Sequence, residues 1–271
     1  MITREQVLES AAALRLRIGQ TPTVGIVLGT GLNDFIHHVQ DKITIPYNDI
    51  PHFPKATVEF HKGQLVVGTV EGVPVVAMQG RFHYYEGYSM QQITFPVRVM
   101  QELGIETLLL SNAAGGMNPA YKKGDLIIIE DHLNLLPDNP LRGLPNGFGN
   151  KFVDMSRPYD LRLQNQLADA FLQQSIAVKK GIYMAVMGPN LETKAEYRWL
   201  RSTGADMVGM STVPEVIVAN QLGVRCGAVS VITDECDPDN LQPVNIDEII
   251  AIAASADKKL SAVLVQTISR L

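Results

Sequence analysis

Short runs of apolar residues, each about the length of one β-strand, constrain the fold of this 271-residue chain more than any other feature. Several runs are apolar at every position, and strands of that kind are usually covered on both faces. The second and third runs are separated by only Glu71 and Gly72, which predicts that these two strands form a tight hairpin. The runs are VGIVL (24–28), QLVVGTV (64–70), VPVVAM (73–78), TLLL (107–110), LIIIE (126–130), GIYMAVM (181–187), DMVGM (206–210) and GAVSVIT (227–233).

Signals for the start of a helix alternate with the later runs. They are Ser89 with Gln92, Thr193 with Glu196, Thr212 with Pro214 and Glu215, and a helical stretch from Asn245 to the C-terminus. Residues 134–158 are rich in Pro, Gly and Asn but too apolar for a disordered linker, so we expect a long ordered loop there. With no repeat or low-complexity linker in view, we predict one α/β domain over residues 1–271, with a central mixed β-sheet flanked by helices.

Charge and cysteine content narrow the functional classes. The net charge is −5 and the Lys and Arg residues are scattered, which argues against nucleic acid or an anionic membrane surface as partner. Cys226 and Cys236 are the two cysteines, and no Cys/His cluster has the spacing of a zinc site. The first residues lack the apolar stretch of a signal peptide, and no run is long enough to span a membrane. We expect a cytoplasmic protein that binds no metal.

Two glycine-containing segments follow predicted strands, where open α/β sheets usually bind ligands. LGTGLNDF (28–35) lets the backbone approach a ligand with the Thr30 hydroxyl beside it, but Asp34 breaks the dinucleotide-binding pattern. SNAAGGMNP (111–119) offers accessible backbone N–H groups that suit an oxyanion, and Asn112 adds an amide. For the first segment, an ordinary strand-to-helix turn is about as good an interpretation as a ligand-binding site. For the second, a tight turn explains the glycines well but explains Asn-Ala-Ala less well.

The segment QGRFHYYEGY (79–88) places Arg81, His83 and Tyr85 at every second position. In an extended chain these side chains share one face. An Arg fork matches phosphate, Glu86 can fix the tautomer of His83, and the Tyr85 ring suits a sugar. The alternative is a solvated strand end, and this segment alone does not decide between them.

Three later segments each have a structural and a functional interpretation. In GPNLETKAEYRWL (188–200), Glu192 is either an acid at a helix start or a ligand-binding carboxylate. In GADMVGMSTVPEV (204–216), Met210 is either a core residue or part of a site ahead of a capped helix. In SVITDEC (230–236), Asp234 and Glu235 are either surface charges at a turn or groups at the end of a strand in a site.

Taken together, these segments resemble the purine nucleoside phosphorylase and methylthioadenosine phosphorylase family of low-mass, trimeric enzymes. The resembling segments occur in order along nearly the whole chain. They are LGTGL, FHKGQL, QGRFHYYEGY, SNAAGGMNP, DHLN, NPLRG, GPNLET, ADMVGMSTVPEV and VIT. The resemblance implies a nucleoside phosphorylase-like fold and reversible phosphorolysis of a purine (2′-deoxy)ribonucleoside to the free base and a pentose 1-phosphate. Phosphate is then a co-substrate, and no cofactor or metal is implied.

The resemblance also assigns residues. The phosphate site would be Thr30, His61, Arg81, His83, Asn112, the Ala113 N–H and Ser211. The ribose site would be Tyr85, Met210, Ile246 and, reaching in from a neighbouring subunit of a homotrimer, Phe152. The purine site would be Ala113, Leu191, Glu192, Gly209, Thr233 and Asp234. His83, Glu86 and Asp234 would act in catalysis, with Glu86 orienting His83.

Base preference depends on two carboxylates, Glu192 and Asp234, which favour different purine substrates. An ionised Glu192 accepts from the N1–H of hypoxanthine or guanine, whereas adenine would leave it unpaired, a penalty of roughly 1–3 kcal/mol. Asp234 occupies a position where the 6-oxopurine branch typically has Asn, and when ionised it favours a 6-amino group instead. A protonated Asp234 would copy Asn, and burial beside Glu192 and Glu235 would favour that proton. Ile246, where the purine branch often has His, suits an apolar 5′ group.

We therefore expect inosine and guanosine as the preferred substrates, with a 6-aminopurine nucleoside or 5′-methylthioadenosine phosphorylase as the alternative. A nucleoside hydrolase and a non-catalytic nucleoside-binding module are two further classes. Phosphate dependence separates the first from a phosphorylase, and release of free base excludes the second.

Overall fold

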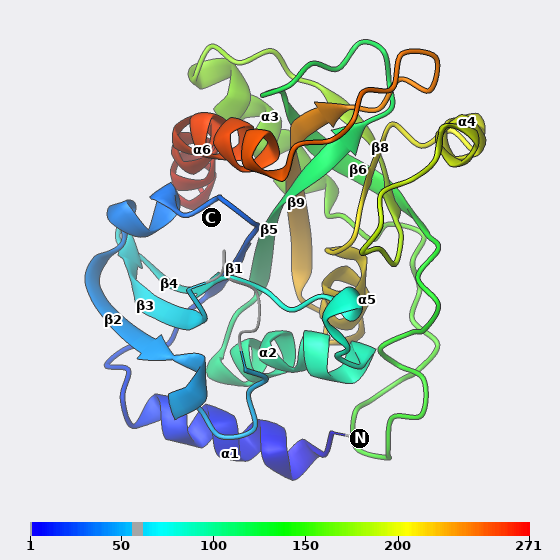
Figure 1. Ribbon diagram of the computed structural model, residues 1–271. Helices are drawn as coiled ribbons and strands as arrows, with labels where there is room; N and C mark the ends of the chain where they lie inside the picture. Colours follow the sequence, from blue (N-terminus) through cyan, green and yellow to red (C-terminus); the bar gives the residue numbers. More distant parts are fainter. Residues whose placement is uncertain (1, 56–61) are drawn as a thin grey trace.

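The computed structural model describes residues 2–55 and 62–271 and shows the predicted α/β fold, with helices on both faces of a mixed sheet (Figure 1). The strands are β1 (Val24–Leu28), β2 (Gln40–Pro46), β3 (Gln64–Val70), β4 (Val73–Gln79), β5 (Thr107–Gly116), β6 (Leu126–Asn134), β7 (Lys180–Ala185), β8 (Met207–Gly209) and β9 (Arg225–Glu235). The α-helices are α1 (Arg4–Arg15), α2 (Met90–Leu103), α3 (Leu161–Gln173), α4 (Lys194–Ser202), α5 (Val213–Gln221) and α6 (Ile246–Ile268). Short 3-10 helices are η1 (Asp34–His38), η2 (Tyr47–Asp49) and η3 (Tyr84–Glu86).

The sheet closes on itself at one side. Its strand order is β2-β3-β4-β1-β5-β8-β7-β6-β9, and β5 pairs additionally with β9. Strands β5, β8, β7, β6 and β9 therefore form a ring, while β2, β3, β4 and β1 extend from it as an open sheet. Because β5 runs parallel to both β1 and β9, the carboxyl ends of these three strands lie at the same edge. That edge is where ligands bind in sheets of this kind.

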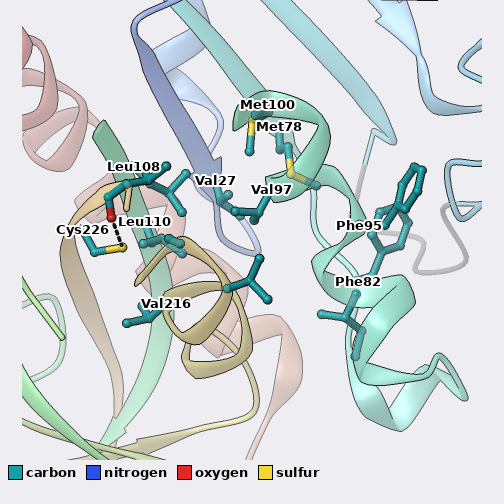
Figure 2. Packing of buried hydrophobic residues seen from close by; sticks show 14 of the residues in the cluster. Val27, Met78, Phe82, Phe95, Val97, Met100, Leu108, Leu110, Val216 and Cys226 are labelled. Carbon is teal, nitrogen blue, oxygen red and sulfur yellow. Dashed lines mark hydrogen bonds between the residues drawn. The ribbon is translucent and has the colours of Figure 1, made fainter. Parts of the chain in front are cut away.

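The core lies on both faces of the sheet, as the uninterrupted apolar runs predict. Along β1, Val27 faces one core cluster, while Ile26 and Leu28 face the other. Helices α1, α2 and α5 cover the first face, and α3 and α6 cover the second (Figure 1). Figure 2 shows side chains of β1, β4 and β5 packed against α2 and α5 on the first face. Across the described part of the chain, no helix has both the length and the apolar character that crossing a bilayer requires.

Several elements differ from the sequence predictions. The hairpin of β3 and β4 is confirmed, with Glu71 and Gly72 at its turn. The segment SNAAGG is not a loop after a strand, because β5 continues through Gly116. Strand β2 and helix α3 were not predicted: β2 is mostly exposed and lacks an apolar run, and α3 has no Ser or Thr at its start. Between residues 134 and 161 the described chain contains neither helix nor strand, as expected of a long loop.

A buried carboxylate ties the segment after β1 to the last helix. Asp257 of α6 accepts hydrogen bonds from the backbone N–H groups of Asn33 and Asp34, both at 2.6 Å, and from the Ser261 hydroxyl at 3.3 Å. Burial raises the pKa of Asp257, and the two backbone hydrogen bonds partly oppose this change. The turn that carries Thr30 is therefore held from the C-terminal helix, about 225 residues further along the chain in sequence.

We predict that Asp257→Asn changes the pH dependence of stability. Because its folded-state pKa is raised above the ordinary value of 3.8, wild-type Asp257 contributes stability below that value and loses this contribution as the pH rises through its folded pKa. Asn keeps the acceptor oxygen and carries no charge. The free energy of unfolding of the variant should therefore rise relative to wild type as the pH increases above 3.8 and through the folded-state pKa of Asp257. Urea unfolding at several pH values, followed by circular dichroism, measures this difference.

Asp257→Ala serves as the contrast, because it leaves both backbone N–H groups without an acceptor. It should lower the free energy of unfolding at every pH, by about 1–3 kcal/mol. A difference between Asp257→Asn and wild type that stays constant across the pH series would contradict this account.

Candidate functional site

A pocket of about 170 Å³ opens at the edge of the sheet where β1, β5, β8 and β9 end. The structure brings most of the predicted site residues together there, although they come from widely separated parts of the sequence. Those that line the pocket are Thr30, Arg81, His83, Tyr85, Asn112, Ala113, Leu191, Glu192, Gly209, Met210, Ser211, Thr233 and Asp234. The strand ends thus gather cationic, hydroxyl, amide, aromatic and carboxylate groups around one cavity.

Arg81 is the buried cation of the pocket. Its Nε donates to Glu215 Oε1 at 3.1 Å, and its Nη1 donates to the Ser111 carbonyl at 2.8 Å and to Ser211 Oγ at 3.2 Å. Its Nη2 is buried and has no hydrogen-bond partner within the described residues. Only 3% of Arg81 is exposed, so the guanidinium is held in one orientation with donor capacity left over. A planar fork fixed in this way suits an oxyanion.

The start of α5 adds more donors beside this guanidinium. Ser211 and Thr212 precede the helix, whose N-terminal N–H groups and dipole favour negative charge. Thr212 has φ = 72°, which is unusual for a β-branched residue, and its hydroxyl accepts from Asn112 Nδ2 at 2.9 Å. Backbone strain of this kind is concentrated at functional sites. Asn112 is thereby fixed at the pocket wall.

His83 is held from behind by Glu86. One Glu86 oxygen accepts from the His83 backbone N–H at 2.8 Å and lies 2.9 Å from His83 Nδ1. This contact fixes the ring orientation of His83, which lines the pocket. The chain is extended only as far as His83, because Tyr85 lies in η3; the predicted alternation therefore ends there. The Tyr85 ring instead stacks on the His83 ring, with centroids 4.7 Å apart and planes 15° apart.

A β-bulge shapes the end of β9. Ala114 pairs with Ile232 and Gly115 with Asp234, so Thr233 has no partner across the ladder. In a regular strand, neighbouring side chains point to opposite faces, and a bulge re-aims one of them. Both Thr233 and Asp234 consequently line the pocket.

Glu192 and Asp234 face the pocket with unlike surroundings. Burial raises the pKa of Glu192, and a hydrogen bond from the Tyr197 side chain partly opposes this. The Cys236 thiol donates to Asp234 Oδ2 at 3.8 Å. Glu235 does not add its charge to the pocket as expected, because its carboxylate is largely exposed and pairs with Lys122 at 2.8 Å.

Some predicted residues lie elsewhere. Ile246 was predicted at the ribose site, but it is half exposed at the first residue of α6; Ile249, one turn further on, lines the pocket instead. Phe152 is 91% exposed on the long loop and does not line this chain's own pocket. Glu86 stands behind His83, outside the pocket lining. His61 lies outside the described residues.

Sequence reasoning missed residues that the fold adds to the site. Tyr197 and Cys236 line the pocket, and Glu215 holds Arg81 from α5. Glu215 had been interpreted only as a helix-start acid, and the signal for its role was its position among the apolar residues of the first two turns of α5. Across the described residues, no three His, Cys, Asp or Glu side chains converge in a way that would hold a metal ion.

Comparison with known proteins places this pocket in a family. Residues 23–269 match the family model described as the phosphorylase superfamily. The chain is 47% identical over 251 residues to purine nucleoside phosphorylase 1 of Bacillus subtilis, with 92% of each chain covered. The chain belongs to the purine nucleoside phosphorylase family. Mouse purine nucleoside phosphorylase is 45% identical over 248 residues, covering 88% of this chain and 86% of the mouse protein.

A solved structure of this family agrees with the fold over almost its whole length. It is isoform 2 of purine nucleoside phosphorylase from Schistosoma mansoni, crystallised with cytosine and ribose-1-phosphate. Its TM-score to the chain is 0.95 at 38% sequence identity, and the match covers 99% of this chain and 97% of the other. The resemblance stated from the sequence is thereby confirmed at the level of family and fold.

We predict that Arg81→Lys weakens the binding of inorganic phosphate. Lysine carries one compact ammonium group and cannot contact Glu215, Ser211 and an anion at once, as the Arg81 fork can. Loss of a charge-assisted hydrogen bond should raise the dissociation constant about ten- to a hundredfold. Isothermal titration calorimetry with phosphate measures it.

Arg98→Lys is the matched control. Arg98 is also buried, but it stacks on Phe148 and donates to Gln221 away from the pocket. This variant should unfold more easily while binding phosphate with unchanged affinity. Equal losses of phosphate affinity in the two variants would refute a specific role for Arg81.

Proposed function

We propose that this protein is a purine nucleoside phosphorylase, which reversibly cleaves purine (2′-deoxy)ribonucleosides with phosphate to give the free base and (deoxy)ribose 1-phosphate. The observation that carries this proposal is the buried Arg81, which lines the pocket and whose fork is fixed by Glu215 and Ser211. A nucleoside hydrolase has no need of such a site for an oxyanion. Relatives at 45–47% identity bear the name of this activity.

At the phosphate end, the anion would be held by Thr30, Arg81, His83, Ser211 and the Ala113 backbone N–H. Asn112 would support the end of β5 at the pocket, and Glu86 would keep His83 oriented as a donor. Phosphate is itself the nucleophile, so no Ser or Cys nucleophile is required. The task of these residues is to hold one phosphate oxygen in line with the anomeric carbon. The positive charge of Arg81 also stabilises the anion in a site shielded from water.

At the other end, the sugar and the base would lie against the remaining pocket residues. Tyr85 and Met210 would contact the ribose, and Leu191 would cover one face of the purine. Gly209 and Thr233 would complete the wall, while Glu192 and Asp234 would contact the edge of the base. As a phosphate oxygen bonds to C1′, the C1′–N9 bond breaks and its electrons pass to the purine. Hydrogen bonds to the base stabilise that developing charge.

We propose inosine and guanosine as the preferred substrates, because Glu192 can accept from the N1–H of a 6-oxopurine. Burial raises the pKa of Glu192, and the Tyr197 side chain opposes that rise and so favours the ionised carboxylate that this contact needs. A 6-aminopurine nucleoside or 5′-methylthioadenosine is the alternative, and Asp234 is the residue that favours it. A schistosome relative has been crystallised with inosine and, in a separate structure, with adenosine.

We also propose that the reaction uses no cofactor beyond phosphate and runs in the cytoplasm. Cys226 and Cys236 are both buried free thiols. Free thiols are usual where the surroundings are reducing, as they are in that compartment.

We predict phosphate-dependent release of base from inosine and guanosine at rates at least tenfold above those from adenosine and methylthioadenosine. The reason is that an unpaired Glu192 costs about 1–3 kcal/mol with adenine. Purified protein would be incubated with each nucleoside, with and without phosphate, and the released base quantified by chromatography. Arg81→Ala protein, purified in parallel, controls for contaminating phosphorylase.

Each other outcome selects a different function. Release without phosphate indicates a hydrolase, and absence of release in every sample indicates a binding module. Faster release from adenosine or methylthioadenosine would mean that Asp234, and not Glu192, sets the base preference.

We further propose a homotrimer in which Phe152 reaches the neighbouring subunit's pocket. Its ring is 91% exposed, yet the backbone around it is ordered by Asn150, which accepts from Phe152 N–H at 3.0 Å and donates to Phe152 O at 2.7 Å. A large apolar ring presented on a fixed loop favours burial in a partner.

We predict that Phe152→Ala lowers kcat/KM for the nucleoside about tenfold or more, since truncating a buried aromatic costs more than 1 kcal/mol. Light scattering should still give a mass three times that of one chain. Leu172→Ala, at an exposed apolar residue of α3, is the matched control and should leave kcat/KM unchanged.

Complementation tests whether Phe152 acts across the subunit boundary. Co-expressed Phe152→Ala and Arg81→Ala chains should regain activity in mixed trimers, because an intact pocket then meets an intact Phe152. Failure to exceed the sum of the separately purified variants, or a monomeric mass, would exclude the shared site.

A further inference from the structure

The last turn of α5 holds the part of the long loop that carries Phe152. The Gln221 side-chain amide, at the end of this helix, donates to the Asn150 carbonyl at 2.9 Å. The neighbouring Asn220 amide donates to the Pro158 carbonyl, also at 2.9 Å. The loop between these two carbonyls is therefore attached to one helix at both ends, and Phe152, which is 91% exposed, lies between the attachments.

A buried cation determines how the Gln221 side chain is oriented. Arg98 of α2 is 2% exposed, and its Nη2 donates to Gln221 Oε1 at 2.8 Å. Its guanidinium also lies over the Phe148 ring, 4.8 Å from the centroid. An arginine offers only donors and a carbonyl only accepts, so the amide satisfies Arg98 and the Asn150 carbonyl in just one of its two orientations. The NH₂ group of Gln221 therefore faces the loop.

The same contacts continue from Asn150 to Phe152. Asn150 accepts from the Phe152 N–H and donates to the Phe152 carbonyl, so the residue held by Gln221 fixes the backbone of the exposed aromatic. A side chain on a mobile backbone loses conformational entropy when a partner buries it, whereas one on a fixed backbone loses less. The hydrogen bond from Gln221 therefore bears on how readily the Phe152 ring is buried by a partner.

We propose that Gln221, oriented by Arg98, is a positioning residue for the nucleoside site of the neighbouring subunit and acts through the loop that carries Phe152. This inference rests on the homotrimer and the shared site proposed above. Gln221 does not line the pocket of its own chain, so its effect arises in the neighbour's pocket. Earlier on the same helix, Glu215 holds Arg81 at the chain's own pocket. One helix thus positions a group for each of two adjacent sites.

Gln221→Glu separates the two contacts of this side chain. A carboxylate still accepts from Arg98, but it cannot donate to the Asn150 carbonyl. We expect kcat/KM for inosine to fall about three- to tenfold, the equivalent of one hydrogen bond. The melting temperature should be no lower than that of wild type, because the buried Arg98 keeps its acceptor and gains a counter-charge. If Gln221 served only stability, activity would instead follow the melting temperature.

The affinity for inorganic phosphate shows whether the substitution disturbs α5 as a whole. Glu215 lies near the start of this helix and holds Arg81, so a displaced helix would weaken phosphate binding. Isothermal titration calorimetry should give the wild-type dissociation constant for phosphate in Gln221→Glu. Loss of nucleoside kcat/KM with unchanged phosphate affinity is the pattern that a positioned Phe152 predicts.

Two further measurements test the route through Phe152. If Gln221 acts through that ring, adding Gln221→Glu to Phe152→Ala should cause no further loss of kcat/KM. If it acts across the subunit boundary, co-expressed Gln221→Glu and Arg81→Ala chains should exceed the summed activity of the separately purified variants. The gain is expected because the intact loops of Arg81→Ala chains then meet the intact pockets of Gln221→Glu chains.

The chain offers a matched control and a second variant of the same route. Gln166 of α3 also donates its side-chain amide to a backbone carbonyl, that of Arg270 at 3.0 Å, and it does not line the pocket. Gln166→Glu should leave kcat/KM unchanged. Asn150→Ala, at an exposed position of the loop, removes the contacts with the Phe152 backbone and should lower kcat/KM as Gln221→Glu does.

The proposal is overturned if Gln221→Glu keeps the wild-type kcat/KM, if its loss adds to that of Phe152→Ala, or if phosphate affinity falls in parallel. Should Gln221→Glu not fold, Asn150→Ala decides the question by the same measurements. Failure of the proposed function is recognised separately, because wild-type protein would then release no base from inosine with phosphate. An unchanged kcat/KM in Phe152→Ala would exclude the shared site, and this inference with it.

Discussion

The parallel pairing of β5 with β1 on one side and β9 on the other is the constraint on which the site depends. Parallel strands end at the same edge, and that edge carries the polar residues of segments separated by up to about 200 positions. The long β5 has a second function, because its last residues also pair with β8 and help to close the ring. Sheet closure and the assembly of the pocket are therefore consequences of one set of backbone hydrogen bonds.

A buried cation at that edge needs support, because a charge removed from water is unfavourable unless it is paired and hydrogen-bonded. Glu215 supplies the counter-charge from α5, and the Ser111 carbonyl supplies an acceptor from β5. One helix and one strand thus determine where the guanidinium lies. The same contacts that stabilise this buried charge therefore also fix the orientation of the guanidinium in the pocket wall.

The sequence predicted what short-range patterns encode and missed what depends on tertiary contacts. Uninterrupted apolar runs predicted the buried strands, and turn chemistry predicted the hairpin at Glu71 and Gly72. Thirteen of the site residues that the resemblance assigned line the pocket in the structure. The start of α6 at Asn245 was predicted, but the sequence did not show which face of that helix meets the pocket, where Ile249 and not Ile246 lies in the wall. Glu215 was missed because it acts on Arg81, 134 positions away in the sequence. Tyr197 and Cys236 were missed because only the tertiary structure brings them to the wall of the pocket.

The bulge at Thr233 has a consequence for how this enzyme family can diversify. Asp234, directly after the bulge, turns its side chain to the pocket, while its main chain completes the pairing with β5. Pairing by main-chain atoms is indifferent to side-chain identity, so an Asn and an Asp at position 234 can both satisfy the same ladder. Substrate range can therefore drift by single substitutions at the rim of the sheet without rebuilding the scaffold beneath it. The main-chain pairing of β5 with β9 must be kept for the fold, whereas the side chains at this rim can change.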